Sequence, residues 1–237
     1  MNKTKIRLLA ATILFLSAVS LSNINATTKQ CINYQCREYK IPLYLKLLDF
    51  YDRHYNYKRL VKNIIQGAST DEERVMRIFE WTYKNIRRNP EGFPIIDDHV
   101  WHIIVRGYGV DDQFSDVFTT LCNYSGIDAI FGFIFTKDKT SNMPLSFIRL
   151  NKRINIFDPY NGVYFVNKNG TFADINEIKS GEGRFKSIAE AQLKVNYKIY
   201  TENLVYDNIE KICLEKPRLQ SPLRRIVFEA KKWMGVK

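Results

Sequence analysis

Several features that mark whole classes of protein are missing from this chain of 237 residues. No stretch of about 20 uninterrupted apolar residues occurs, which argues against a multi-span membrane protein. There is no glycine- and proline-rich tract and no repeat at solenoid spacing, so collagen-like and repeat architectures are excluded. The sequence also lacks a phosphate-binding glycine loop and a cluster of metal-ligating residues, and we therefore expect neither a cofactor nor a metal.

The composition is that of a folded globular protein. Hydrophobic residues make up 45% of the chain and charged residues 26%, which is enough apolar material for a packed core. The length fits one large domain or two small ones.

The N-terminus has the three-part pattern of a secretory signal peptide. A basic start is followed by an apolar run without charge, residues 8–21, and then by small or polar residues. We predict that residues 1–26 direct export to the periplasm or the cell exterior, with cleavage after Ser22 or Ala26. The alternative is an uncleaved membrane anchor formed by residues 8–21, although this run is short for a bilayer crossing.

The formal net charge of the chain is +11. A basic exported protein suits anionic partners such as lipid headgroups or acidic polysaccharide, whereas export argues against nucleic acid. Alternatively, the charge is spread over the surface and only keeps the protein soluble.

The chain has four cysteines. Cys31 and Cys36 are close in sequence, and in an exported chain we predict that they form a disulfide. A zinc site there would need two more ligands nearby, and the nearest histidine is His54. Cys122 lies among apolar neighbours and is expected to be a buried thiol. Cys213 could pair with it, and the sequence leaves that pairing open.

Helices are predicted first along the chain and strands later. Apolar spacing indicates a helix over residues 42–66 and a stronger one that begins at Thr70, where Glu73 completes a capping box. A loop is predicted over residues 89–110, and another helix begins at Asp111. Strands are predicted over residues 127–135, 145–150, 153–157 and 163–166, and a last helix over residues 222–234. Helices followed by an antiparallel meander predict an α+β fold.

Several short blocks, in matching order, resemble the transglutaminase-like superfamily. They are residues 80–86 (E-W-T-Y-K-N-I), 106–118 (R-G-Y-G-V-D-D-Q-F-S-D-V-F), 121–127 (L-C-N-Y-S-G-I), 145–150 (L-S-F-I-R-L) and 156–160 (I-F-D-P-Y). The resemblance implies the papain-like cysteine-protease fold, in which N-terminal helices pack on an antiparallel sheet.

With this resemblance, the chain divides into four predicted parts. They are a signal peptide or anchor (1–26), an N-terminal helical segment (27–69), a transglutaminase-like core (70–170), and a C-terminal extension with a basic amphipathic helix (171–237).

The resemblance fails at the catalytic residues. The superfamily uses Cys, His and Asp in that order, and these positions correspond here to Asp111, Leu145 and Asp158. No histidine follows His102, so a shifted alignment cannot restore the triad. Asp111 is expected to stabilise the start of its helix instead. Asp158, without a histidine, is expected to find another partner, such as a turn amide or Arg149.

The substitutions predict a pseudoenzyme that binds or scaffolds at the cell envelope. Its ligand would be a peptide or a glycan in the former catalytic cleft, which Leu145 should make more apolar. The residues that we expect to bind it are Trp101, Asp112, Gln113 and Tyr160.

Two other functions remain open. Asp111 and Asp158 could form a rewired carboxylate site of a hydrolase or transferase. Alternatively, the helix over residues 222–234 could bind an anionic membrane surface, because basic residues flank its apolar stripe. The stripe consists of Leu223, Ile226, Val227, Ala230 and Trp233. It could also pack on the chain's own core.

Overall fold

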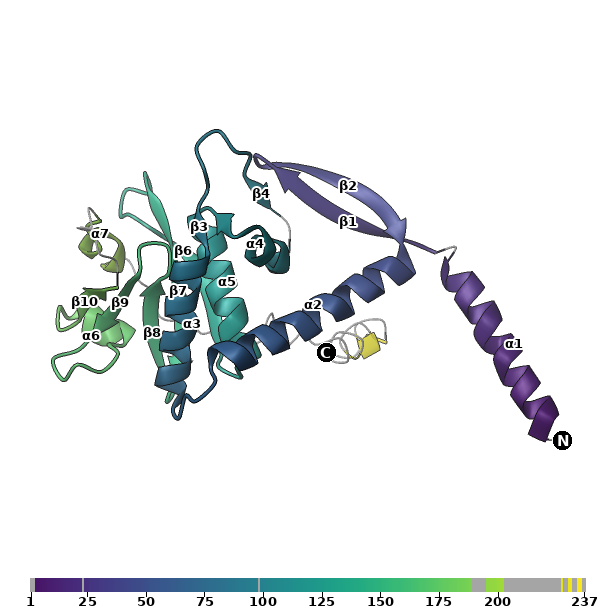
Figure 1. Ribbon diagram of the computed structural model, residues 1–237. Coiled ribbons are helices and arrows are strands. Elements are labelled where there is room, and N and C mark those ends of the chain that lie inside the picture. Colours follow the sequence, from purple (N-terminus) through teal and green to yellow (C-terminus); the bar gives the residue numbers. More distant parts are fainter. Residues whose placement is uncertain are drawn as a thin grey trace.

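Figure 1 shows the computed structural model of the protein, which describes residues 3–22, 24–97, 99–188 and 195–202 and five positions after residue 226. Its helices are α1 (Lys3–Ser22), α2 (Leu43–Ile64), α3 (Asp71–Asn85), α4 (Val100–Arg106), α5 (Asp111–Tyr124), α6 (Ile175–Lys179) and α7 (Lys198–Thr201). Its strands are β1 (Asn25–Ile32), β2 (Gln35–Pro42), β3 (Arg87–Arg88), β4 (Ile96–Asp97), β5 (Tyr108–Gly109), β6 (Ala129–Phe135), β7 (Asn142–Leu150), β8 (Arg153–Asp158), β9 (Val163–Val166) and β10 (Arg184–Ser187). The predicted α+β class is confirmed.

The centre of the fold is a five-stranded antiparallel sheet with the strand order β10-β9-β8-β7-β6. Each strand pairs with its neighbour in sequence, as when Ser146 of β7 lies opposite Phe157 of β8. The four predicted strands correspond to β6, β7, β8 and β9. Strand β10 extends the sheet beyond residue 170, the predicted end of the core.

The central strands of this sheet are buried on both faces, because side chains alternate along β7 between two apolar clusters. Ile148 and Leu150 belong to the first cluster, which they share with residues of α3 and α5. Leu145 and Phe147 belong to the second cluster, which they share with Tyr197 and with residues of α6. Helices α3 and α5 therefore cover one face of the sheet, and the segment after β9 covers the other (Figure 1).

Helix α3 begins where the capping pattern predicted. The Thr70 hydroxyl accepts a hydrogen bond from the backbone N–H of Glu73 (3.1 Å), and the Glu73 carboxylate accepts one from the backbone N–H of Ser69 (2.7 Å). These bonds satisfy backbone amides that have no partner within the helix. The helix buries Val75, Ile78, Phe79 and Thr82.

The segment over residues 27–69, predicted to be helical, begins with a hairpin and is helical only from Leu43 onward. The hairpin turn consists of Asn33 and Tyr34, whose φ values of 49° and 66° fit a tight two-residue connection between antiparallel strands. All of β2 before Ile41 is exposed, so its sequence carries no alternation of apolar and polar residues that would identify a half-buried strand.

The segment over residues 89–110, predicted as a loop, contains α4. This helix has seven residues and buries only Val100 and Ile103, so its apolar period is too short to detect in the sequence. It ends at Gly107, whose φ of 72° is the left-handed conformation that glycine adopts without strain.

Cys31 and Cys36 form the predicted disulfide, which closes the tip of the hairpin. Their Cα atoms are 3.9 Å apart, and the two residues are paired across the strands. Cys31 and Ile32 also pair with Asp97 and Ile96 of β4, so the closed tip is joined to the segment that precedes α4. The disulfide indicates an oxidising compartment, as expected of an exported chain.

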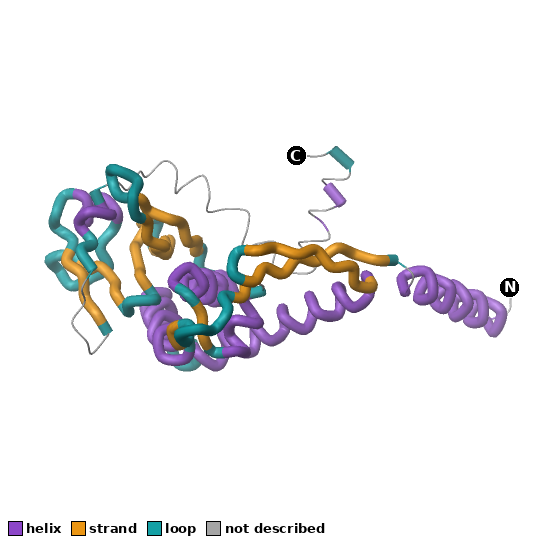
Figure 2. Tube along the Cα trace, turned by 90° about the horizontal axis from the view of Figure 1, so that it is seen from above, coloured by secondary structure: helices purple, strands orange, loops and turns teal. Residues whose placement is uncertain are grey.

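The hairpin, α1 and the first half of α2 extend away from the sheet, as the two views in Figures 1 and 2 agree. The buried residues of α2 all lie at or after its midpoint; they are Arg53, His54, Tyr57 and Val61. At the far end of the hairpin, Ala26 pairs with Ile41, and the Leu43 N–H donates to the Ile24 carbonyl (2.7 Å). None of the helices that the structure describes is long and apolar enough to cross a bilayer.

Two of the sequence predictions concern residues that lie partly or wholly outside the part of the chain that the structure describes. Cys122 is a free thiol that is fully buried, as expected, but its proposed partner Cys213 lies outside the described residues. Most of the predicted helix over residues 222–234 lies outside them as well.

The first prediction concerns the disulfide. Replacing both Cys31 and Cys36 by serine should lower the unfolding free energy in urea by up to about 2 kcal/mol, the value expected for so short a loop. Hydrogen exchange should become faster in β1 and β4 and remain unchanged in β7 and β8. Peptide mapping of the unreduced wild-type protein provides the control, and two free thiols at these positions would contradict the assignment.

Candidate functional site

The start of α5 holds Asp111, the residue that the resemblance aligns with the nucleophile. Asp111 is the first residue of the helix and is exposed, and its carboxylate accepts a hydrogen bond from the Asp112 N–H (2.9 Å). A carboxylate in the first helical turn also interacts favourably with the helix dipole. The location of Asp111 therefore agrees with the predicted role in stabilising the start of the helix.

Gln113 fixes the geometry of this helix start. Its side chain is 6% exposed, and its amide nitrogen donates to the Ile96 carbonyl (2.7 Å) while its amide oxygen accepts from Arg106 (3.1 Å). A Cβ on Gly109 would lie 2.7 Å from the same amide oxygen, so only glycine fits there. Gln113, a predicted ligand-binding residue, thus joins β4, α4 and α5 through both ends of its amide.

Asp112 lies beside Asp111 in a partly buried position. Burial raises the pKa of the Asp112 carboxyl, and the negative charges of Asp111 and Asp97 raise it further. One carboxyl oxygen is buried and has no hydrogen-bond partner among the residues that the structure describes. The helix start is therefore acidic, a poor environment for a thiolate or for an anionic ligand.

Asp158, which the resemblance aligns with the aspartate of the triad, is 1% exposed at the end of β8. One carboxylate oxygen accepts from the backbone N–H groups of Tyr160 (3.1 Å) and Asn161 (3.0 Å). The other accepts from the Asn161 side chain (2.8 Å) and from the Tyr197 hydroxyl (2.7 Å). Burial raises the pKa of Asp158 and these hydrogen bonds oppose the rise. The predicted turn amides are present, whereas Tyr197 takes the place that we had suggested for Arg149.

Leu145, which the resemblance aligns with the histidine of the triad, is fully buried in the second apolar cluster. Because Ser146 pairs with Phe157, Leu145 lies opposite Asp158, one step further along the two strands. Both residues are on the sheet face that is turned away from α5, since Ile148 and Phe157 contribute to the cluster on the α5 side. The structure therefore brings positions 145 and 158 together and packs an apolar side chain beside the carboxylate.

Two other predicted ligand-binding residues, Tyr160 and Trp101, are packed against aromatic rings. Tyr160 contacts Phe114 edge to face (ring centres 5.1 Å apart), and the Arg88 guanidinium lies 4.4 Å from the centre of the Tyr160 ring. Trp101 of α4 packs edge to face on Tyr57 (5.4 Å). Phe114 links the first turn of α5 to the turn after Asp158, so positions 111 and 158 belong to one end of the fold.

The two carboxylates at this end nevertheless have separate surroundings. Burial raises the pKa of Asp158, and the hydrogen bonds that oppose this rise come from Asn161, Tyr197 and Tyr160. Burial also raises the pKa of Asp112, and there the neighbouring charges are those of Asp111 and Asp97. In the part of the chain that the structure describes, no three histidine, cysteine or acidic side chains gather in a way that could hold a metal ion. Positions 111, 145 and 158 carry neither a thiol nor an imidazole, and the hydrogen bonds of Asp158 come from Tyr160, Asn161 and Tyr197.

Two partners of Asp158 went unrecognised in the sequence. Asn161 belongs to the segment D-P-Y-N-G, whose residues are typical of a tight turn, so its contact with Asp158 could have been inferred. Tyr197 lies 39 residues after Asp158, in a region without clear periodicity, and nothing in the sequence indicates their contact.

The fold and site agree with a family assignment. Residues 58–182, more than half of the chain, match the sequence model of the transglutaminase-like superfamily. The chain therefore belongs to the transglutaminase-like superfamily. No curated protein matches it in sequence.

Solved structures similar to this chain include a protein from Cytophaga hutchinsonii assigned as a cysteine protease, with 15% identity and a TM-score of 0.38 over 67% of this chain and 61% of that chain. A TGase matches with 11% identity and a TM-score of 0.37 over 87% of this chain and 53% of that chain. A protein from Parabacteroides distasonis assigned as a protease matches with 9% identity and a TM-score of 0.38 over 74% and 41%. This chain thus spans only 41% to 61% of the length of these structures.

The second prediction concerns the contact between Tyr197 and Asp158. Tyr197→Phe should lower the unfolding free energy by about 1–3 kcal/mol, because a buried carboxylate loses one of its donors. The matched control is Tyr200→Phe, which removes the hydroxyl that contacts Ser141 at an exposed site and should change stability little. In a double-mutant cycle with Asp158→Asn, the two effects should not add. Additive effects would show that the hydrogen bond contributes nothing.

The third prediction concerns the pH dependence of stability. Because burial raises the pKa of Asp158 in the folded state, its contribution to stability is fully present below the unfolded-state pKa of about 3.9. That contribution is lost as the pH rises through the folded-state pKa. The unfolding free energy of Asp158→Asn should therefore increase relative to that of the wild type as the pH is raised from 3.5 to 7. Parallel pH profiles for the two proteins would argue against the raised pKa.

Proposed function

We propose that this protein is an exported, catalytically inactive member of the transglutaminase-like superfamily that acts by binding at the cell envelope. The observation that carries the proposal is the state of the retained aspartate. Asp158 accepts four hydrogen bonds from Tyr160, Asn161 and Tyr197 and is 1% exposed, so it is not available to orient a catalytic base.

The residues at the other two triad positions support the same proposal. Asp111 has no thiol that could act as a nucleophile, and the apolar side chain of Leu145 cannot accept a proton. Since no histidine follows His102 in the chain, no neighbouring position of the sheet supplies an imidazole. Removal of a nucleophile or of its base each lowers the rate of such enzymes by orders of magnitude.

The disulfide and the N-terminal sequence support export. The Cys31–Cys36 disulfide fits an oxidising compartment, and the apolar run of residues 8–21 follows a basic start. On this proposal, residues 1–26 act as a signal peptide, or α1 remains as an anchor on the membrane. Either outcome would keep the α+β core at the cell envelope.

A membrane-surface function through residues 222–234 is the second candidate. Val227, which belongs to the apolar stripe of this segment, is 53% exposed, as a residue that contacts lipid would be. The basic residues around it would attract an anionic membrane. A rewired carboxylate enzyme has less support, because it would need Asp111 and Asp158 to act together.

The fourth prediction tests for catalysis. The protein should show no incorporation of a fluorescent amine into casein and no peptide hydrolysis above background, with or without iodoacetamide. Cys122 cannot rescue activity, because it is fully buried and burial raises its pKa well above the usual value of a thiol. In a Cys213→Ser background, Ellman's reagent should therefore detect no thiol until the protein is unfolded. Alkylation-sensitive activity would overturn the proposal.

A further inference from the structure

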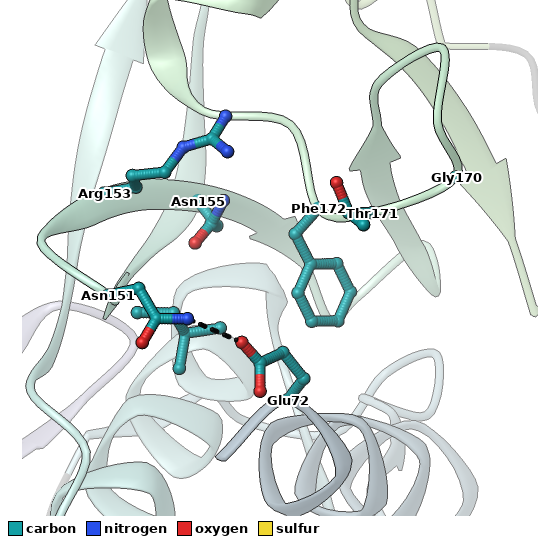
Figure 3. Close-up of a pocket in the computed structure, with 8 residues that line it drawn as sticks. Glu72, Asn151, Arg153, Asn155, Gly170, Thr171 and Phe172 are labelled. Carbon is teal, nitrogen blue, oxygen red and sulfur yellow. Dashed lines mark hydrogen bonds between the residues drawn. The ribbon is translucent and has the colours of Figure 1, made fainter. Parts of the chain in front are cut away.

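A pocket lies at the end of β8 that is remote from Asp158. Its volume is about 440 Å³, which falls within the range of roughly 300–1,000 Å³ that is usual for ligand sites. It is formed by the start of α3, the turn between β7 and β8, and the segment after β9 (Figure 3). Its lining residues are Glu72, Leu150, Asn151, Arg153, Asn155, Gly170, Thr171 and Phe172.

One wall of the pocket is a hydrogen-bonded pair of polar side chains. The Asn151 amide nitrogen donates to the Glu72 carboxylate (2.9 Å), which joins the β7–β8 turn to the first turn of α3. Asn151 has a positive φ of 51°, a conformation that asparagine adopts more readily than most residues. The turn therefore contributes a side-chain amide, and α3 contributes a carboxylate, at the edge of the same space.

The opposite wall combines an amide with an aromatic ring. Asn155 is 3% exposed, and its amide nitrogen donates to the Ala173 carbonyl (3.1 Å), which fixes the orientation of its side chain. Figure 3 shows the Asn155 amide oxygen turned toward Asn151 and Glu72, and the Phe172 ring across from the two asparagines. The Phe172 ring is itself held by edge contacts with Phe157 and is partly buried.

The charge of the pocket argues against an anionic ligand. Arg153 forms ion pairs with Asp174 (3.0 Å) and Glu177, so its positive charge is already neutralised. Glu72 then contributes a negative charge on the opposite side. A phosphate or carboxylate ligand would be repelled, whereas an uncharged ligand with hydroxyl groups would not.

We propose that this pocket binds an uncharged saccharide unit. Sugar hydroxyls both donate and accept hydrogen bonds, so they match the Asn155 carbonyl oxygen, the Glu72 carboxylate and the Asn151 side-chain amide. The Thr171 hydroxyl donates to the Asn167 side chain (3.1 Å) and keeps its capacity to accept a hydrogen bond. The apolar C–H face of a sugar ring would pack on Phe172. This inference gives the proposed binding role a location and a ligand class, but it places the ligand away from the former catalytic cleft.

The test is calorimetric titration of the full chain with four neutral tetrasaccharides at millimolar concentration. They are maltotetraose, cellotetraose, mannotetraose and tetra-N-acetylchitotetraose, with a mixture of uncharged tripeptides as the comparison. We expect at least one saccharide to bind and the tripeptides not to bind. If none of the four saccharides binds, or if the peptides bind and the saccharides do not, the proposal is overturned.

A matched pair of variants locates the site. Asn151 and Lys152 are adjacent in the turn and both have positive φ values (51° and 65°), so glycine fits either position. Asn151→Gly removes a lining amide and should weaken saccharide binding at least tenfold, whereas Lys152→Gly should change it less than twofold. Equal binding by both variants would place the saccharide elsewhere.

Glu72→Gln separates the saccharide proposal from a cationic ligand. Glutamine keeps the hydrogen-bonding capacity of the side chain and removes its charge, so saccharide binding should fall less than fivefold. Spermidine provides the cationic probe, and binding of spermidine that Glu72→Gln abolishes, without saccharide binding, would replace the proposed ligand class. Failure of saccharide binding would leave the absence of thiol-dependent activity unaffected, so the two proposals can fail separately.

Discussion

The central strands of the five-stranded sheet, β7 and β8, are buried on both faces, so a polar side chain there is stabilised mainly by partners within the protein. Along β7, side chains alternate between the cluster under α5 and the cluster under Tyr197. Position 145 falls in the second of these, where a leucine needs no partner and an imidazole would need at least one. The leucine at position 145 is therefore compatible with the apolar packing of this face of the sheet.

The two ends of β8 differ in how fully their polar side chains are hydrogen-bonded. At one end, the Asp158 carboxylate has four donors, which include a tyrosine from a distant part of the chain. At the other end, Asn155 has one fixed hydrogen bond, and its carbonyl oxygen faces an open space (Figure 3). A polar side chain that already has its partners stabilises the fold, whereas one with unused capacity is able to recognise a ligand. The hydrogen bonding of these side chains thus distinguishes the end of β8 at Asp158 from the end that borders the pocket.

Much of the fold could be predicted because its elements bury one face and have clear ends. Helix α3 has a capping pattern and an apolar stripe, and strands β6 to β9 form an uninterrupted meander. Among the elements that the sequence did not predict, the β1–β2 hairpin is mostly exposed and α4 has only seven residues, so both bury little. The identity of Asp111 and Leu145 was readable in the sequence, and the contact of Tyr197 with Asp158 was not, because it depends on tertiary packing alone.

The pocket also lay beyond sequence analysis, for a different reason. Glu72, Asn151 and Phe172 come from three segments that are far apart in the chain, and each looks like an ordinary surface or turn residue in isolation. Only the register of β7 against β8 and the position of α3 bring them around one space.

The far end of the β1–β2 hairpin has a consequence for the maturation of the protein. Ala26 is paired with Ile41, and the carbonyl of Ile24 accepts the N–H at the start of α2. A peptidase binds its substrate as an extended chain, and a paired strand cannot enter its active site. If cleavage follows Ala26, it has to occur before the hairpin closes, and the order of processing and folding is then fixed by the position of a single strand. The mature chain would begin inside β1 and would lose the first two cross-strand pairs of the hairpin.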